Sequence, residues 1–117
     1  MSKQGPFLFV GHDDALASKI CLACGDDANF HRVARRSPLP APMFYKAIFV
    51  ATDETAWQMV VELHSQRGDF VVVAKNFPVS ETDDEILALG AKQVVSQNDT
   101  VQTIRGKLEA VGLLGET

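Results

Sequence analysis

Residues 7–16 read FLFVGHDDAL, a short apolar run that passes through one glycine into a helix-like segment. A dinucleotide site carries the pattern G-x-G-x-x-G at such a place, where the glycines allow a tight turn and close approach of backbone to a pyrophosphate. Only Gly11 remains of that pattern, since Asp13 and Leu16 stand at the second and third glycine positions. The carboxylates of Asp13 and Asp14 would repel phosphates from a helix N-terminus that otherwise attracts them. The stretch therefore predicts a strand–helix unit with an altered ligand site.

The rest of the chain alternates strand-like apolar runs with amphipathic segments. Runs that are apolar at every position are typical of strands buried on both faces of a parallel sheet. The predicted strands are 7–10, 30–34, 47–51, 70–74 and 93–96. The residues expected to cap the following helices are Asp13 or Asp14, Thr52 or Asp53, Thr82 with Glu85, and Asn98 or Asp99. We therefore expect an α/β fold, a three-layer Rossmann-like sandwich around a five-stranded, mostly parallel sheet.

Residues 37–42 read SPLPAP, and three prolines in six positions forbid a regular helix. A doubly wound domain ordinarily carries a helix between its second and third strands. We predict that this chain replaces that helix with a proline-rich crossover. Such a crossover would leave apolar sheet surface uncovered, so the face from Pro38 to Tyr45 is a candidate surface for a homodimer or for another protein partner.

The composition limits the classes of function. A length of 117 residues favours one domain, which would span residues 1–117. The net charge of −4 argues against nucleic-acid binding, which needs a concentrated basic surface. The longest apolar runs span about five residues, too few to cross a membrane, and the first residues lack the apolar core of a signal peptide. We expect a cytoplasmic protein.

Cys21 and Cys24 form a C-x-x-C motif. In a thioredoxin-type site this motif lies at a helix N-terminus, where the helix dipole lowers the pKa of the first thiol. Here the predicted helix ends just before Gly25, so the dipole has the opposite sign. A zinc site would need two further ligands, and the histidines are scattered without ligand spacing. We interpret the cysteines as ordinary, partly buried thiols, with a redox or metal role as the alternative.

From Lys46 onward the chain resembles the TrkA-N family, also called RCK or KTN domains. The resembling segments are AIFVATDE at 47–54, a strand that runs into a Thr-Asp turn, and ILALGAKQVVS at 86–96, a helix-Gly-Ala-strand segment. With residues 7–11 included, the resemblance covers most of the chain by pattern. It implies a Rossmann-like, nucleotide-binding regulatory module of the kind found in potassium channels and transporters.

This resemblance also implies a ligand crevice at the carboxyl ends of the strands. The turn Thr52-Asp53 matches and would contact an adenosine, and Lys75 matches the basic residue after the fourth strand, whereas Arg35 stands near the place of the family's acidic residue. The resemblance predicts a regulatory, ligand-sensing domain with a degenerate or altered nucleotide site, holding an adenine nucleotide (NAD(H) or ATP/ADP) or no cofactor. The candidate site residues are Gly11, His12, Asp13, Thr52, Asp53 and Lys75.

The chain is also similar to response-regulator receiver domains. This second resemblance is carried by Asp13 and Asp14 after the first strand, Asp53 after the third, and Gly90-Ala91 before the fifth. Receiver domains use a clustered acid pair for magnesium and an aspartate as phosphoacceptor. Their pattern also has Ser or Thr after the fourth strand and Lys after the fifth, and Ala74 and Ser96-Gln97 occupy those places here. The alternative function is therefore a pseudo-receiver-like protein-interaction module that binds no nucleotide.

The candidate residues also have structural explanations, because the Asp and Thr side chains can cap helices without any ligand. Catalytic patterns are absent from the sequence: it contains no Ser-His-acid set, no H-E-x-x-H, no Walker loop and no nucleophile elbow. We therefore do not expect an enzyme.

Overall fold

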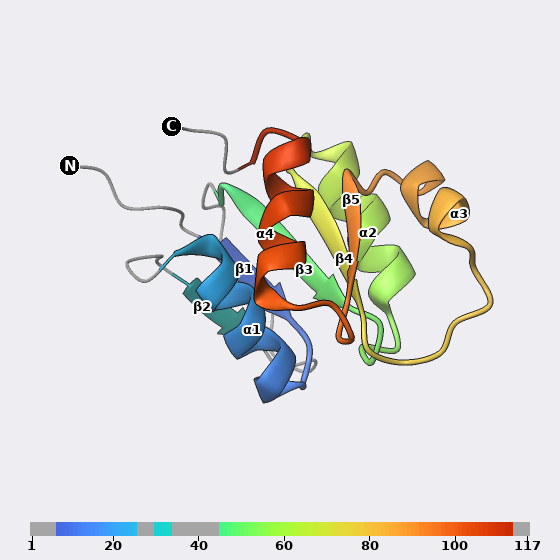
Figure 1. Ribbon diagram of the computed structural model, residues 1–117. Coiled ribbons are helices and arrows are strands. Elements are labelled where there is room, and N and C mark those ends of the chain that lie inside the picture. The colour runs from blue at the N-terminus through green and yellow to red at the C-terminus, as the bar shows by residue number, and fades with distance from the viewer. Residues whose placement is uncertain (1–6, 26–29, 34–44, 114–117) are drawn as a thin grey trace.

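The computed structural model describes residues 7–25, 30–33 and 45–113, and it shows a sheet with helices on both faces (Figure 1). The strands are β1 (Phe7–Val10), β2 (Phe30–Val33), β3 (Ala47–Ala51), β4 (Val71–Lys75) and β5 (Gln93–Ser96). The helices are α1 (Asp14–Cys24), α2 (Trp57–Gln66), α3 (Asp83–Ala88) and α4 (Val101–Ala110).

The strands lie in the order β2-β1-β3-β4-β5, and every neighbouring pair is parallel. The predicted α/β fold around a parallel sheet is therefore confirmed. This order is that of flavodoxin-like doubly wound sheets, whereas a dinucleotide-binding sheet has the order 3-2-1-4-5-6. The third strand, β3, therefore lies on the side of β1 opposite to β2. There it pairs with β1, and Val10 is in register with Val50. The direction of chain winding changes between β1 and β3.

Successive strand residues point to opposite faces of the sheet and build two cores. Phe7, Phe9 and Phe49 are fully buried on the face covered by α1 and α4. Leu8, Ile48 and other strand residues of opposite parity lie on the face covered by α2 and α3. Figure 1 shows α1 and α4 side by side on one face, with α2 on the other. Because both faces are covered, the strands are apolar at nearly every position, as the sequence predicted.

The helix starts confirm some capping predictions and correct others. Asp13 caps α1 by accepting a hydrogen bond from the Leu16 N–H at 3.0 Å, and Thr82 forms a capping box with Glu85 on α3. The prediction of a Thr52 or Asp53 cap is wrong, because α2 begins after Ala56 with no side-chain cap. The predicted Asn98 or Asp99 cap is also wrong. Thr100 caps α4, since its hydroxyl accepts from the Thr103 N–H at 3.0 Å.

The proline-rich crossover at 37–42 lies outside the described residues, as does the proposed dimer face Pro38–Tyr45 except for Tyr45 itself. Both therefore stay predictions. Within the described ranges, no helix combines the length and the apolar character that would let it cross a bilayer.

Candidate functional site

In a doubly wound sheet, ligands bind at the carboxyl ends of the strands, where the winding direction changes. This place lies here between the ends of β1 and β3, and we call it the switch-point crevice: Gly11, His12 and Asp13 on one side, Thr52 and Asp53 on the other. At Gly11 a Cβ atom would lie 2.7 Å from the Ala51 Cβ and 3.0 Å from the Asp53 Oδ1. Its backbone φ of +155° is also rarely adopted by other residues. The glycine thus allows the two strand ends to approach each other, which explains its presence without a bound phosphate.

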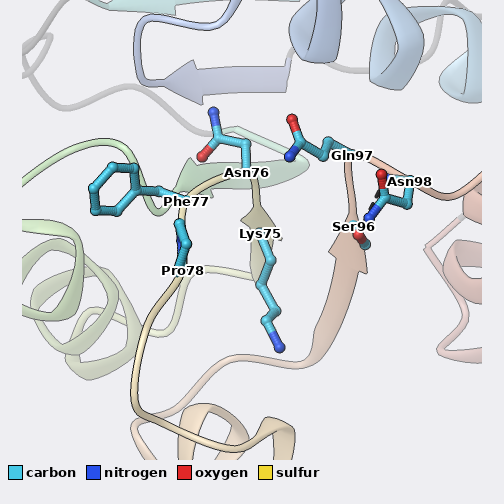
Figure 2. Close-up of a pocket in the computed structure, with 7 residues that line it drawn as sticks. All are labelled: Lys75, Asn76, Phe77, Pro78, Ser96, Gln97 and Asn98. Carbon is cyan, nitrogen blue, oxygen red and sulfur yellow. Dashed lines mark hydrogen bonds between the residues drawn. The ribbon is translucent and has the colours of Figure 1, made fainter.

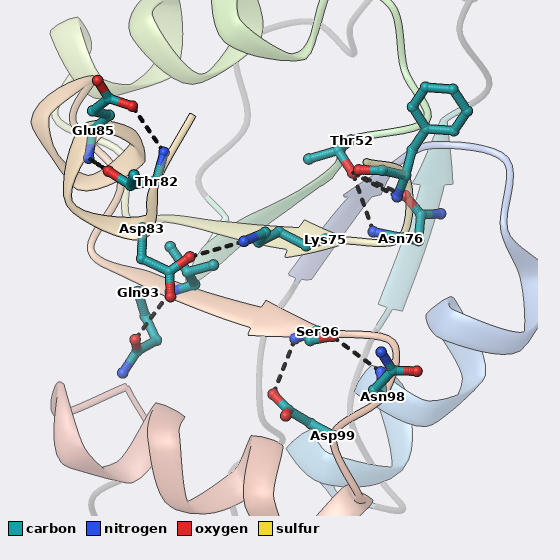
Figure 3. A network of polar contacts seen from close by, with 12 residues as sticks. Thr52, Lys75, Asn76, Thr82, Asp83, Glu85, Gln93, Ser96, Asn98 and Asp99 are labelled. Atoms are coloured by element: carbon teal, nitrogen blue, oxygen red, sulfur yellow. Dashed lines mark hydrogen bonds and ion pairs between the residues drawn. The ribbon is translucent and has the colours of Figure 1, made fainter. Parts of the chain in front are cut away.

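The Thr52 hydroxyl is buried and joins the end of β3 to the loop after β4 (Figure 3). It accepts hydrogen bonds from the N–H groups of Asn76 (3.1 Å) and Phe77 (3.0 Å). Its own proton faces the Phe77 carbonyl oxygen at 3.0 Å and the Asn76 Oδ1 at 3.3 Å. A hydroxyl has one proton and two lone pairs, so this hydroxyl has no capacity left for a ligand.

Asn76, which the sequence analysis did not single out, lies at the centre of the crevice. Its Oδ1 accepts a hydrogen bond from the Asp53 N–H at 3.0 Å, and its Nδ2 donates to the Asp13 Oδ2 at 3.2 Å. The other Asp13 oxygen accepts from the Leu16 N–H. One amide side chain therefore connects the loops that follow β1, β3 and β4. We call Asp13, Thr52, Asp53 and Asn76 the crevice network.

His12 and Glu54 lie beside this network. The His12 N–H donates to the Asp53 carboxylate, at 3.3 Å from Oδ2, and the His12 Nε2 lies 3.9 Å from the Glu54 Oε1. Glu54 is 3% exposed, and its Oε2 accepts from the Ala56 N–H at 3.0 Å. Its Oε1 has no hydrogen-bond partner among the described residues. Sequence reasoning missed Glu54, because a glutamate near a helix start usually lies in solvent.

Lys75 does not join the other predicted site residues. Its Nζ donates to the Asp83 Oδ1 at 3.0 Å, at the start of α3. Figure 2 shows Lys75 and Asn76 pointing in opposite directions from the end of β4. Strand alternation explains this, because Lys75 has the same parity as Val71 and Val73, whose side chains face α2 and α3. The structure brings together the other five candidates, Gly11, His12, Asp13, Thr52 and Asp53.

A hollow of about 300 Å³ lies next to the crevice, between the ends of β4 and β5. It is lined by Lys75, Asn76, Phe77, Pro78, Ser96, Gln97 and Asn98, and we call it the β4/β5 hollow. In Figure 2, Phe77 and Pro78 lie on one side, Ser96, Gln97 and Asn98 on the other, and Lys75 between them. Among these seven residues, sequence analysis proposed only Lys75 as a ligand-binding residue.

The far wall of this hollow is held by charged side chains outside it. Lys19 of α1 donates to the carbonyl oxygens of Gln97 (2.6 Å) and Asp99 (2.9 Å). The Asp99 carboxylate accepts from the Ser96 N–H at 3.0 Å and from the Lys107 Nζ at 2.8 Å. Burial alone would raise the pKa of Asp99, but the hydrogen bonds from Lys107 and Ser96 and the charges of Lys107 and Lys19 hold that pKa below its ordinary value. The loop after β5 is therefore fixed at several points.

The cysteines lie at the end of α1, away from both regions. Cys24 is buried and Cys21 is partly exposed, and both are free thiols. Burial, together with the nearby Cys21, raises the pKa of Cys24 to about 12 against the charges of Lys46 and Arg105. A thiol with so high a pKa is a poor nucleophile at neutral pH. For Cys24, this agrees with the interpretation as an ordinary buried thiol. In the part of the chain that the structure describes, no three His, Cys, Asp or Glu side chains are placed to hold a metal.

No family model and no curated protein matches the sequence. Solved structures match the fold at low sequence identity. NtrX from Brucella abortus, solved in complex with ADP, matches with a TM-score of 0.67 and 10% identity over 92% of this chain, which spans only 26% of NtrX. A response regulator from Thermotoga maritima matches with a TM-score of 0.65 and 9% identity, covering 91% of this chain and 96% of that one. Response regulator RPA3017, in red light signaling of R. palustris, matches with a TM-score of 0.64 and 15% identity, covering 95% and 96%.

These matches correct the first family resemblance. The similar structures include response-regulator proteins, some matched along nearly their whole length, so the resemblance to TrkA-N domains is wrong, and the nucleotide-binding role that it implied loses its basis. Both families alternate strands and helices, and a local sequence pattern does not reveal on which side of β1 the third strand pairs. The order β2-β1-β3-β4-β5 separates them here. The chain has the fold of a receiver domain.

Proposed function

We propose that residues 1–117 form a regulatory, non-catalytic domain of pseudo-receiver type, which acts by binding a protein partner and does not accept a phosphoryl group. The single observation that supports this proposal most is the crevice network. In a receiver domain the corresponding crevice must admit a magnesium ion and a phosphoryl group. Here the Thr52 hydroxyl and the Asn76 amide hold the loops after β1, β3 and β4 together by hydrogen bonds.

The residue types support the same proposal. Ala74 occupies the place of the hydroxyl residue in the receiver pattern, and Ser96-Gln97 that of the lysine. Alanine has no hydroxyl, and neither Ser96 nor Gln97 carries a charge. The hydroxyl of the crevice network, that of Thr52, is buried and fully hydrogen-bonded. Lys75, which directly follows Ala74, forms an ion pair with Asp83.

The energetic cost of opening the crevice also favours an interaction role. A magnesium ion bound at Asp13 would compete for a carboxylate whose two oxygens already accept hydrogen bonds from the Leu16 N–H and the Asn76 amide. Each hydrogen bond contributes about 0.5–1.5 kcal/mol, and a buried group left unpaired costs about 1–3 kcal/mol. The opening therefore opposes metal and phosphoryl binding, whereas a partner that docks elsewhere on the domain needs no such change.

Treatment with acetyl phosphate and Mg²⁺, followed by intact-mass measurement, tests this proposal. We expect no phosphorylated species under conditions in which a phosphorylatable receiver domain, run in parallel, is modified. A phosphorylated product that disappears in the Asp53→Asn variant would contradict the proposal, because Asp53 would then be an acceptor. Modification that persists in that variant would contradict it as well, with the acceptor located by peptide mapping.

A further inference from the structure

We infer that the β4/β5 hollow is a docking site for a peptide segment of the partner, which places one aromatic side chain, with its neighbouring peptide groups, in the hollow. This inference rests on the proposed interaction function and adds to it a place and a binding chemistry. The observations that support it are the fixed walls of the hollow, its free amide groups, its charge balance and its size.

Phe77 forms an exposed but fixed rim. Its side chain is 60% exposed, yet its N–H and its carbonyl oxygen both bond to the buried Thr52 hydroxyl. An aromatic side chain on a fixed backbone loses little conformational entropy on binding. Less of the favourable contact energy is therefore offset, and the binding affinity is higher. Among the described residues, the other exposed large apolar side chains lie on helices and do not line the hollow; these are Leu22, Met59, Leu63 and Leu87.

The opposite wall offers free hydrogen-bonding groups on a fixed backbone. The Gln97 N–H donates to the Lys75 carbonyl oxygen at 3.0 Å, and the Asn98 N–H donates to the Ser96 Oγ at 3.1 Å. The side-chain amides of Gln97 and Asn98 have no hydrogen-bond partner within the described ranges. Each amide carries one acceptor and two donors, which complement the N–H and C=O groups of a peptide.

The charge balance of the hollow favours a neutral ligand. Its charged lining residue, Lys75, already pairs with Asp83 at 3.0 Å, so a phosphate or carboxylate would have to compete for this ammonium group. The apolar rim of Phe77 and Pro78 also favours an aromatic ring over a charged group. An aromatic side chain therefore suits this site better than an acidic one.

The size agrees with a single side chain. The volume of about 300 Å³ lies at the lower end of the range for small-molecule pockets, which is about 300–1,000 Å³. One aromatic residue with its flanking peptide groups matches both the volume and the polar groups.

The test is an NMR titration of the ¹⁵N-labelled chain with N-acetyl-phenylalaninamide, which carries one aromatic ring and two amide groups. N-acetyl-alaninamide serves as the control ligand. We expect saturable shifts of the backbone amides at residues 75–77 and 96–98 with the aromatic probe, and none with the alanine probe. Phe77→Ala should weaken binding about tenfold or more, as the loss of an interface anchor does. Gln97→Ala should weaken it less.

Met59→Ala is the matched control variant, because Met59 is 70% exposed and lies on α2 away from the hollow. It should bind the probe as the wild type does. The inference would be overturned by shifts absent from the hollow, by shifts unaffected in Phe77→Ala, or by adenosine binding there more tightly than the aromatic amide. The acetyl phosphate experiment does not involve the hollow. A failed titration with no phosphorylation would thus reject the docking site alone, and phosphorylation would reject the proposed function.

Discussion

The switch-point crevice and the β4/β5 hollow lie at the same edge of the sheet, and both are lined by polar residues. In the crevice, Thr52, Asn76 and Asp13 use their side-chain atoms to bond one another and the nearby backbone. In the hollow, the amides of Gln97 and Asn98 have no such partners among the described residues, and Phe77 is exposed. Polar residues at a ligand-binding edge therefore indicate a ligand only where their hydrogen-bonding groups are not already paired within the protein.

The two regions are physically connected. Asn76 belongs to the crevice network and also lines the hollow, and the Thr52 hydroxyl fixes the Phe77 backbone. The hydrogen bonds of the crevice network therefore hold the residues that line the hollow in position, and in our proposal the crevice binds no ligand. Variants of the network should accordingly affect stability first and the hollow second.

Gly11→Ala should give the largest loss of stability. The new Cβ would lie 2.7 Å from the Ala51 Cβ, at a φ of +155° that alanine rarely adopts. Overpacking of this kind costs about 1–3 kcal/mol, and the backbone strain adds to it. We expect a loss of about 2–4 kcal/mol in the free energy of unfolding, measured by urea denaturation. Gly106→Ala is the matched control: no atom lies within 4 Å of its new Cβ, so this helix position should gain up to about 1 kcal/mol.

Thr52→Val should follow, because it keeps the side-chain shape and removes the buried hydroxyl. The N–H groups of Asn76 and Phe77 and the Phe77 carbonyl oxygen then lose their partner. We expect a loss of about 2–3 kcal/mol in the free energy of unfolding. We also expect broadened Phe77 resonances in NMR spectra.

Thr55→Val, at an exposed position three residues further on, should change stability by less than about 0.5 kcal/mol. Equal stabilities of the two valine variants would show that the Thr52 hydroxyl does not hold the network together.

Asn76→Ala tests the bridge between the loops. The change removes the acceptor of the Asp53 N–H and the donor to Asp13. Since these groups are partly buried, the expected loss is about 1–2 kcal/mol, measured by thermal and urea unfolding. The same change at Asn98, whose side-chain amide has no partner within the described ranges, should leave stability nearly unchanged. A larger loss of stability in Asn98→Ala than in Asn76→Ala would contradict the view that the crevice amide is hydrogen-bonded and the hollow amide is not.

Asp99→Asn should have the smallest effect of the four, about 1 kcal/mol at pH 7, because it weakens the contacts to Lys107 and the Ser96 N–H. The pKa of Asp99 is lowered in the folded state, so its carboxylate stabilises the fold above its ordinary pKa. That contribution is lost as the pH falls through the ordinary pKa towards the lowered one. The stability difference between wild type and Asp99→Asn should therefore vanish in strong acid. Glu62→Gln, at an exposed position of α2, should show no such pH dependence.

Local sequence signals predicted much of this molecule. Apolar runs located the strands, and Asp13 and the Thr82–Glu85 pair located two helix starts. Five of six candidate site residues meet, because the carboxyl ends of parallel strands share one edge. Strand alternation by itself predicts that Lys75 points towards α3 and that Asn76 points to the opposite face.

The rest depends on contacts between distant parts of the chain. No local pattern shows that β3 pairs with β1, which is what separates the flavodoxin-like order from the dinucleotide-binding one. A threonine after a strand can cap the next helix or bury its hydroxyl, and the local sequence is the same in both cases. Only the loop after β4, more than twenty residues away, makes Thr52 the second of these.

An NMR titration with Mg²⁺ and beryllium fluoride, a phosphoryl analogue, tests directly whether the crevice network opposes metal and phosphoryl binding. The amide resonances of Gly11, Thr52 and Asn76 report on the three loops that the network joins. Our account predicts that they do not move when both reagents are present in large excess. Saturable shifts at these residues that are lost in Asp53→Asn would contradict it, because they would show an open acceptor site in the crevice.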